Sequence, residues 1–281
     1  TNPGFIGTTK AGCIVIPKGL RPTNPLVADK RTGQMSLAKK IVEKYRSQEA
    51  SENNEKNKSM QQAQMLTSMG SLDPEIQNLV DVGKMLPLME AFYTIQGEGY
   101  HSGKSAFFLR IGGCDVGCHW CDVKESWNAD LHPPTEIHKM IDQILAYPAK
   151  TVVVTGGEPL MWNMQPLTDS LHNKGMSVHI ETSGAYPLSG DFDWICLSPK
   201  KNNPPKEAII PKANELKVII HNRNDFKWAE QFASQCFSEC KLYLQPEWSK
   251  AKEMMPEIVD YVMNNPKWNI SLQSHKYMNI P

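Results

Sequence analysis

Residues 105–122 read SAFFLRIGGCDVGCHWCD, an apolar run followed at once by a cysteine-rich segment. Cys114, Cys118 and Cys121 fall within eight residues, and three glycines are interspersed with them or precede them. The apolar run predicts a buried strand, and the glycines indicate that the segment after it is a loop. We therefore expect a strand that ends in a loop shaped around its three thiols.

Strand-like runs and helical patterns alternate from about residue 85 to the end of the chain. Apolar, β-branched runs lie at 105–113, 151–157, 177–184, 193–200, 214–222, 241–248 and 268–275, with helical patterns at 134–147, 164–175 and 251–265. Such alternation is typical of parallel βα units. The number of units favours an α/β fold that forms a partial or modified (β/α) barrel. In such barrels the site lies at the carboxyl ends of the strands, where TGGEP, ETSG, SPK and QPEW also fall.

The N-terminal part of the chain has a different composition. Residues 47–71 are polar and nearly free of branched or aromatic side chains, so they bury too little apolar surface to offset the entropy of ordering. The segment 73–84, DPEIQNLVDVGK, could form a short helix. We predict a partly disordered extension over residues 1–84, without an assigned function, and a core domain over 85–281.

Composition and charge exclude several classes of protein. Lys and Arg total 30 and so do Asp and Glu, whereas a nucleic-acid-binding protein usually has a basic excess. No apolar run approaches the ~20 residues of a membrane helix, and the N-terminal residues do not resemble a secretory signal. Seven scattered cysteines do not form a disulfide framework. We therefore expect no nucleic-acid partner, no membrane span, reduced thiols and a cytoplasmic location.

Three interpretations of the cysteine loop are open. A structural zinc site needs four ligands, and adding His119 would crowd all four into eight residues. Cys236 and Cys240, which we expect in a helix, do not supply a second Cys-x-x-Cys pair. A four-iron cluster normally takes four thiolates, so three would leave one iron open to a small molecule. Buried, inert thiols are the third interpretation. The glycines favour the cluster.

The loop and one later motif resemble the radical S-adenosylmethionine (SAM) enzymes. The cysteines have Cys-x3-Cys-x2-Cys spacing with Trp120 before the last, and GGEP, residues 156–159, follows the next strand-like run. The resemblance implies a 4Fe-4S cluster whose open iron binds the amino and carboxylate groups of SAM. An electron from the cluster then cleaves SAM to methionine and a 5′-deoxyadenosyl radical.

The segment FYTIQGEG, residues 92–99, just ahead of the first predicted strand, narrows the resemblance. With it, residues 85–281 are similar to the 7-carboxy-7-deazaguanine synthase family of 7-deazapurine (queuosine) biosynthesis. The resemblance implies a carbon–nitrogen lyase that converts 6-carboxy-5,6,7,8-tetrahydropterin to 7-carboxy-7-deazaguanine with loss of ammonia. It also implies a homodimer and an electron donor such as flavodoxin or ferredoxin. The alternatives are a glycyl-radical-enzyme activase and a non-catalytic binding module stabilised by zinc or a cluster.

The resemblance also implies which residues form the site. The cluster ligands would be Cys114, Cys118 and Cys121. The substrate would bind to Ile95, Gln96, Gly97, Arg110, Thr155 and Pro281, the last residue of the chain. SAM would contact His119, Trp120, Cys121, Gly157, Glu158, Ser198, Pro199, Lys200, Gln245, Pro246, Glu247 and Trp248.

One position departs from the family pattern. The family commonly has a threonine after Cys-Asp, and its hydroxyl binds Mg²⁺, but this chain has Val123 there. A valine side chain offers no oxygen, so we expect Mg²⁺ to bind more weakly and to depend on the substrate and water. His101 and His275 are left without a role, and no residue is assigned to proton transfer.

Overall fold

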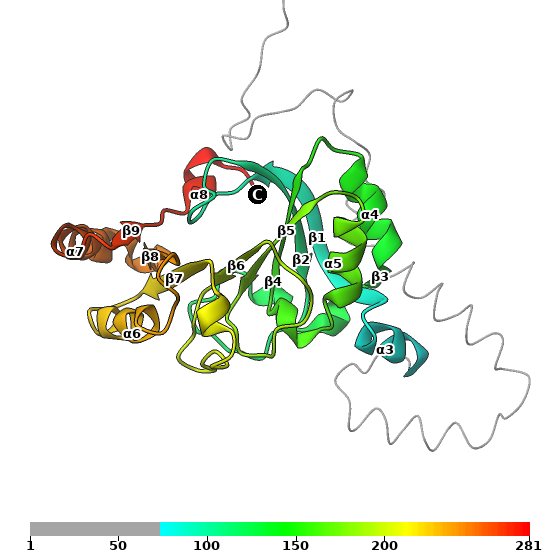
Figure 1. Cartoon of the computed structure of the whole chain (residues 1–281), viewed down its shortest axis with the longest axis horizontal. Coiled ribbons are helices and arrows are strands. Elements are labelled where there is room, and N and C mark those ends of the chain that lie inside the picture. The colour runs from blue at the N-terminus through cyan, green and yellow to red at the C-terminus, as the bar shows by residue number, and fades with distance from the viewer. Residues whose placement is uncertain (1–73) are drawn as a thin grey trace, which may run out of the picture. The chain divides into compact units, whose positions relative to one another are not determined.

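The computed structural model describes residues 74–281, so most of the predicted extension, including 47–71, lies outside the described residues (Figure 1). Helix α3, Pro74–Asp81, is the part of that extension that is described, and it is helical as its sequence indicates. Its Val80 is fully buried. No helix in the described part of the chain is long and apolar enough to cross a membrane.

The core is one open sheet with the strand order β3-β1-β2-β4-β5-β6-β7-β8-β9. β1 runs antiparallel to β2 and β3, and every neighbouring pair from β2 to β9 is parallel. The strands are β1 Met85–Ile95, β2 Ser105–Ile111, β3 Pro134–Glu136, β4 Thr151–Gly156, β5 Ser177–Thr182, β6 Trp194–Leu197, β7 Glu215–Ile220, β8 Lys241–Pro246 and β9 Trp268–Ile270. The predicted α/β fold is confirmed, and its sheet does not close into a complete barrel, because the end strands β3 and β9 do not pair.

Helices provide several of the crossovers that parallel strands require. They are α4 Ile137–Leu145, α5 Gln165–His172, α6 Asn224–Ala233, α7 Ala251–Asn264 and the C-terminal α8 Ser274–Met278. In Figure 1, α4 and α5 lie beside the strands at one end of the sheet, and α6 and α7 lie at the other end. The expected helices at 134–147, 164–175 and 251–265 are confirmed, except that 134–136 form strand β3.

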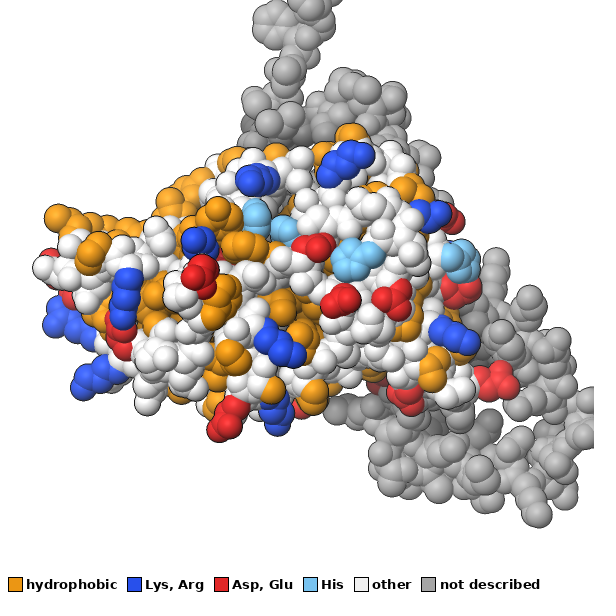
Figure 2. Space-filling model, in the orientation of Figure 1, with side chains coloured by type: hydrophobic (Ala, Val, Ile, Leu, Met, Phe, Trp, Pro, Cys, Tyr) orange, Lys and Arg blue, Asp and Glu red, His pale blue; other side chains and the backbone are white. Residues whose placement is uncertain are grey.

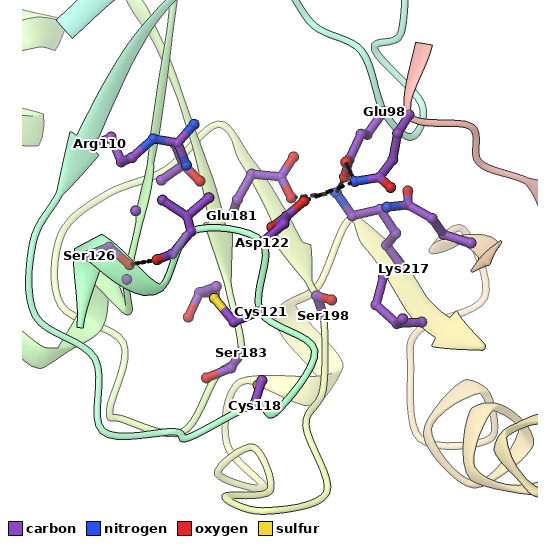
Figure 3. A pocket seen from close by; sticks show the side chains of 18 of the residues that line it. Glu98, Arg110, Cys118, Cys121, Asp122, Ser126, Glu181, Ser183, Ser198 and Lys217 are labelled. Carbon is purple, nitrogen blue, oxygen red and sulfur yellow. Dashed lines mark hydrogen bonds and ion pairs between the residues drawn. The ribbon is translucent and has the colours of Figure 1, made fainter. Parts of the chain in front are cut away.

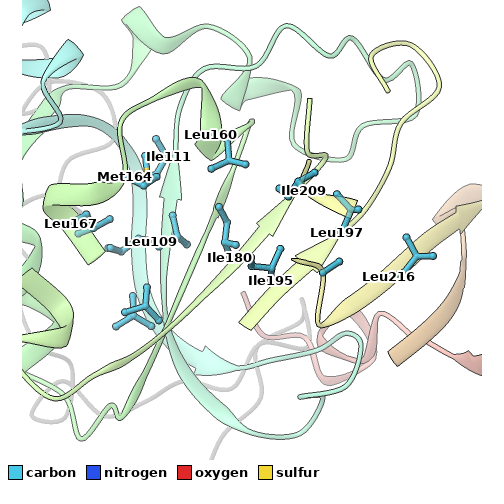
Figure 4. Packing of buried hydrophobic residues seen from close by; sticks show 14 of the residues in the cluster. Leu109, Ile111, Leu160, Met164, Leu167, Ile180, Ile195, Leu197, Ile209 and Leu216 are labelled. Carbon is cyan, nitrogen blue, oxygen red and sulfur yellow. The ribbon is translucent and has the colours of Figure 1, made fainter. Parts of the chain in front are cut away.

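The two faces of the sheet differ in polarity. In β5, Val178 and Ile180 are fully buried in the main hydrophobic core, whereas His179 and Glu181 alternate with them toward the opposite face. Figure 4 shows this core, to which Leu109, Ile180 and Leu197 are contributed by three different strands. Burying one such side chain contributes about 1.5–3 kcal/mol. The core therefore fixes which side chains point toward the polar face.

Two expectations need correction. The segment before the first predicted strand is itself largely strand, since β1 extends to Ile95 and pairs with β2. Cys236 and Cys240 do not lie in a helix, because α6 ends at Ala233 and the chain then turns into β8. The amide of Cys240 donates a hydrogen bond to the Phe237 carbonyl within that turn. The two cysteines are four residues apart, which is also the spacing of neighbours on one face of a helix.

The connection between β1 and β2, residues 96–104, bends over the polar face of the sheet. The amides of Gln96 and Gly103 bond to the carbonyls of Lys104 and Gln96, respectively, at 2.8 Å. Gly99 has a φ of +63°, and a Cβ atom there would lie 1.9 Å from Oε1 of Glu215. Only glycine therefore permits this connection to sit so close to β7.

Basic and acidic side chains are interspersed on the face of the molecule shown in Figure 2, and neither sign dominates it. This distribution agrees with equal totals of 30 basic and 30 acidic residues. On this face we find no basic stripe that would follow a nucleic-acid backbone.

Candidate functional site

A cavity of about 310 Å³ opens at the carboxyl ends of the parallel strands. Side chains from the end of β1, the cysteine loop, the turn after β4, the ends of β5 to β8 and the C-terminus line it. Figure 3 shows that Arg110, Cys121 and Lys217 come from different elements and surround the same space. The strand ends that the sequence grouped together thus share one site.

The three cysteines of the loop line this cavity and are partly exposed to it. The loop is held by backbone bonds, since the Cys114 amide donates to the Trp127 carbonyl and the Cys121 amide donates to the Cys118 carbonyl. No three His, Cys, Asp or Glu side chains within residues 74–281 converge as they would around a single metal ion. A four-iron cluster does not need such convergence on one ion, because it takes each thiolate on a separate iron.

Burial disfavours the charged form of two of the three thiols. It raises the pKa of Cys114 to about 11 and also raises the pKa of Cys118. Coordinated metal ions deprotonate thiols outright, so a bound cluster would offset this effect of burial. Three thiols on one loop at the edge of the cavity fit the donor set of such a cluster.

The GGEP turn lies directly against the cysteine loop. A Cβ atom on Gly157 would lie 2.2 Å from the Gly113 carbonyl oxygen, so only glycine permits the contact. The Glu158 amide donates to that same oxygen at 2.8 Å. The Glu158 carboxylate is itself buried and accepts bonds from the side chains of Thr182 and Ser183, each at 2.5 Å. Glu158 thus fastens the turn to the end of β5.

Most of the residues predicted to contact SAM also line the cavity. The exceptions are His119, whose ring lies 5.4 Å from that of His221, and Pro199, which is buried. Nζ of Lys200 donates to the Ser198 carbonyl and hydroxyl at 2.6 Å and lies 5.7 Å from the Trp120 ring centroid. Burial lowers the pKa of Lys200. The SAM-binding roles themselves remain predictions.

The residues predicted to bind the substrate line the same cavity. Arg110 of β2 and Thr155 of β4 are direct neighbours in the parallel register. Nε of Arg110 donates to Glu90 at 3.1 Å, which leaves the two terminal nitrogens of the guanidinium for another acceptor. Phe92 and Phe108 stack with their ring centroids 5.5 Å apart and form an apolar wall. The cavity is also lined by the other predicted substrate residues, Ile95, Gln96, Gly97 and Pro281.

Sequence reasoning missed a buried ion-pair network on the polar face. Nζ of Lys217 lies 2.7 Å from Oε2 of Glu98 and 2.8 Å from Oε2 of Glu181. The side-chain nitrogen Nε2 of Gln96 donates a hydrogen bond to Oε1 of Glu181 at 3.2 Å. Burial alone would lower the pKa of Lys217, but the facing negative charges raise it well above its usual value. Burial likewise raises the pKa of Glu98, yet Lys217 outweighs this effect and lowers it to about 2.

Signals for this network were present in the sequence. Glu98 lies in TIQGEG, which was noted just ahead of the first predicted strand, and Glu181 lies in ETSG, which was noted at a strand end. Lys217 has a weaker signal, a charged residue inside the apolar run ELKVII. His275, which was left without a role, also lines the cavity.

The sequence of this chain is similar to those of known proteins of one family. Residues 109–198 match the family model of the Radical SAM superfamily. A 7-carboxy-7-deazaguanine synthase from Flavobacterium psychrophilum is 62% identical over 210 residues, which cover 75% of this chain and 100% of that protein. The synthase from Synechocystis sp. is 48% identical over 194 residues, which cover 69% of this chain and 93% of that protein.

The fold comparison leads to the same family. The crystal structure of QueE from Escherichia coli matches with a TM-score of 0.62 and 28% identity, over 73% of this chain and 100% of that chain. These comparisons favour neither the glycyl-radical-enzyme activase nor the non-catalytic module. The chain is a radical SAM enzyme and belongs to the 7-carboxy-7-deazaguanine synthase family.

Proposed function

We propose that this chain converts 6-carboxy-5,6,7,8-tetrahydropterin to 7-carboxy-7-deazaguanine, with loss of ammonia, in the cavity described above. One observation carries the proposal: the three cysteines, the GGEP turn and the polar residues of the β1 end line a single space of about 310 Å³. Thiols, a guanidinium and a side-chain amide thus line the same space.

Cys114, Cys118 and Cys121 would hold the 4Fe-4S cluster, and the SAM-binding set would lie between the cluster and the strand ends. When bound, the cluster and SAM supply the radical that removes a hydrogen atom from the substrate. Glycine at position 157 keeps the GGEP turn close to the cysteine loop, since a Cβ atom there would lie 2.2 Å from the nearest backbone atom. Trp120 and Trp248 provide apolar surface at the edge of the cavity.

The chain's own residues would orient the pterin. Arg110 suits the substrate carboxylate, because a guanidinium binds a carboxylate through paired N–H groups. The hydroxyl of Thr155 and the Gln96 amide suit the donors and acceptors along the pterin edge. The carboxylates of Glu98 and Glu181 are held by Lys217 and can each accept a further N–H donor. Pro281 would also contact the substrate, with Ile95 and Gly97 shaping the pocket.

The residues next to the cluster fit Mg²⁺ poorly. Val123 lines the cavity but has no oxygen on its side chain. The adjacent Asp122 is already paired with Lys276, with Nζ and Oδ2 2.9 Å apart. We therefore assign no step to magnesium. Any Mg²⁺ that assists would depend on oxygen atoms of the substrate and of water.

The remaining proposals concern partners. Reduction of a cluster requires an electron donor, and a flavodoxin or ferredoxin has the appropriate chemistry. We further propose a homodimer and a cytoplasmic location. Free cysteines at all six described positions support a reducing compartment.

Anaerobic reconstitution with iron and sulfide, followed by SAM, reductant and the carboxypterin, tests the proposal. Mass spectrometry should detect 7-carboxy-7-deazaguanine and ammonia release. Arg110→Met is the matched variant, because it should keep SAM binding and lose at least tenfold in kcat/KM for the carboxypterin. Cleavage of SAM without any deazaguanine in the unmodified protein would refute the substrate assignment and leave the radical SAM class intact.

A further inference from the structure

Lys276 of α8 is the point at which three parts of the site meet. Its ammonium lies 2.9 Å from Oδ2 of Asp122, the residue that follows the last cysteine of the loop. It also lies 3.2 Å from Oε1 of Gln273 and 4.6 Å from the ring centroid of Trp248. Its side chain is only 21% exposed, so the ammonium is held within these contacts. Lys276 does not itself line the cavity.

The segment around Lys276 depends on such contacts for its position. Helix α8 has five residues, which is too short to be stable by itself. The backbone amide and the hydroxyl of Ser274 both donate hydrogen bonds to the Gly97 carbonyl oxygen at 2.9 Å. Nε2 of Gln273 donates to Glu98 at 3.0 Å. The C-terminal segment is thus bound to the residues that are proposed to hold the substrate.

The helix then turns the end of the chain back to the cavity. Asn279 adopts a left-handed conformation, with φ 53°, and the Ile280 amide donates to the His275 carbonyl at 3.2 Å. Pro281 consequently lines the cavity. In Figure 1 the C-terminus lies next to α8. The position of Pro281 therefore follows from the position of α8.

We propose that Lys276 is a positioning residue that couples the cysteine loop to the C-terminal segment. Its ion pair with Asp122 connects α8 to the cysteine loop, and its cation–π contact with Trp248 connects α8 to the turn after β8. The proposal rests on the proposed function for its effect on turnover. Loss of the ammonium should leave the cluster and SAM in place and let residues 274–281 detach more often. A partly exposed ion pair and a cation–π contact together correspond to roughly a tenfold change in such an equilibrium.

Lys276→Met tests the proposal, because methionine keeps much of the apolar length and removes the charge. In the holoenzyme, we expect the KM for the carboxypterin to rise, by at most about tenfold, with kcat, iron content and SAM cleavage in the absence of substrate within twofold. Amide exchange in residues 274–281, followed by mass spectrometry, should be about tenfold faster. Lys276→Arg should restore both values to within threefold. Lys174→Met, an exposed lysine just after α5, is the matched control and should change neither.

The partner residue provides a second measurement. Asp122→Asn should loosen residues 274–281 to a smaller extent, because it removes the ion pair and keeps the contact of Lys276 with Trp248, and the double variant should be no looser than Lys276→Met alone. Unchanged exchange in Lys276→Met, failure of arginine to restore it, or additive effects of the two changes would each overturn the coupling. If the unmodified enzyme made no deazaguanine, the proposed function would fail, while the exchange data would still decide the role of Lys276.

Discussion

Replacing Lys217 by methionine should destabilise the protein, because two carboxylates would lose their cation. Nζ of Lys217 lies 2.7 Å from Glu98 and 2.8 Å from Glu181, and the lysine side chain is 5% exposed. Breaking a buried ion pair by removing one partner costs about 3–5 kcal/mol. The two carboxylates are 18% and 20% exposed, so partial hydration places the expected loss near the lower end, at about 3 kcal/mol.

This loss converts into a measurable change in thermal unfolding. For a folded unit of 150–250 residues, 1 kcal/mol shifts Tm by roughly 2–4 °C, so we expect a decrease of about 6–12 °C. Circular dichroism of the anaerobic holoenzyme at pH 7.5 measures it. The decrease should shrink toward pH 4.5, because the unpaired carboxylates of Glu98 and Glu181 then take up protons.

A compensating variant separates electrostatics from packing. Adding Glu98→Gln and Glu181→Gln to Lys217→Met removes the uncompensated charges and should recover at least half of the lost Tm. A decrease below about 2 °C in Lys217→Met, or no recovery in the triple variant, would show that the buried network does not stabilise the fold by this mechanism.

The other predictions concern the cluster, the metal and pH. Cys118→Ala should abolish the brown colour and SAM cleavage, whereas Cys236→Ala, in the turn after α6, should retain both; equal loss in the two variants would contradict the loop assignment. Val123→Thr should lower the Mg²⁺ concentration needed for half-maximal turnover, and identical titrations would argue against a hydroxyl effect. Burial and the negative charge of Glu181 raise the pKa of Glu215 from 4.5 to about 7, so the folded state binds the extra proton. The contribution of Glu215 to stability therefore falls as pH rises from 4.5 to 7, and Glu215→Gln should flatten Tm over this window; an unchanged profile would contradict it.

Local patterns determined much of this protein before any tertiary information. The alternation of apolar runs with helical patterns predicted the parallel strands, because the periods of two and 3.6 residues are properties of the backbone itself. The spacing of Cys114, Cys118 and Cys121 indicated a cluster for a similar reason, since the ligands come from one short loop. The motifs at strand ends were expected to meet because parallel strands bring their carboxyl ends to one edge.

Only the tertiary structure decided which charges face one another across the sheet. Glu98 and Lys217 are separated by 119 positions, and Asp122 and Lys276 by 154, so no local period relates them. The turn at Cys236 was misread as helix because a four-residue spacing does not reveal that the chain must reverse to enter β8. Lys217 appeared as a lone charge in an apolar strand. It pairs with two carboxylates, Glu98 from the 96–104 connection and Glu181 from β5. These two elements meet beside Lys217 only when the sheet is packed.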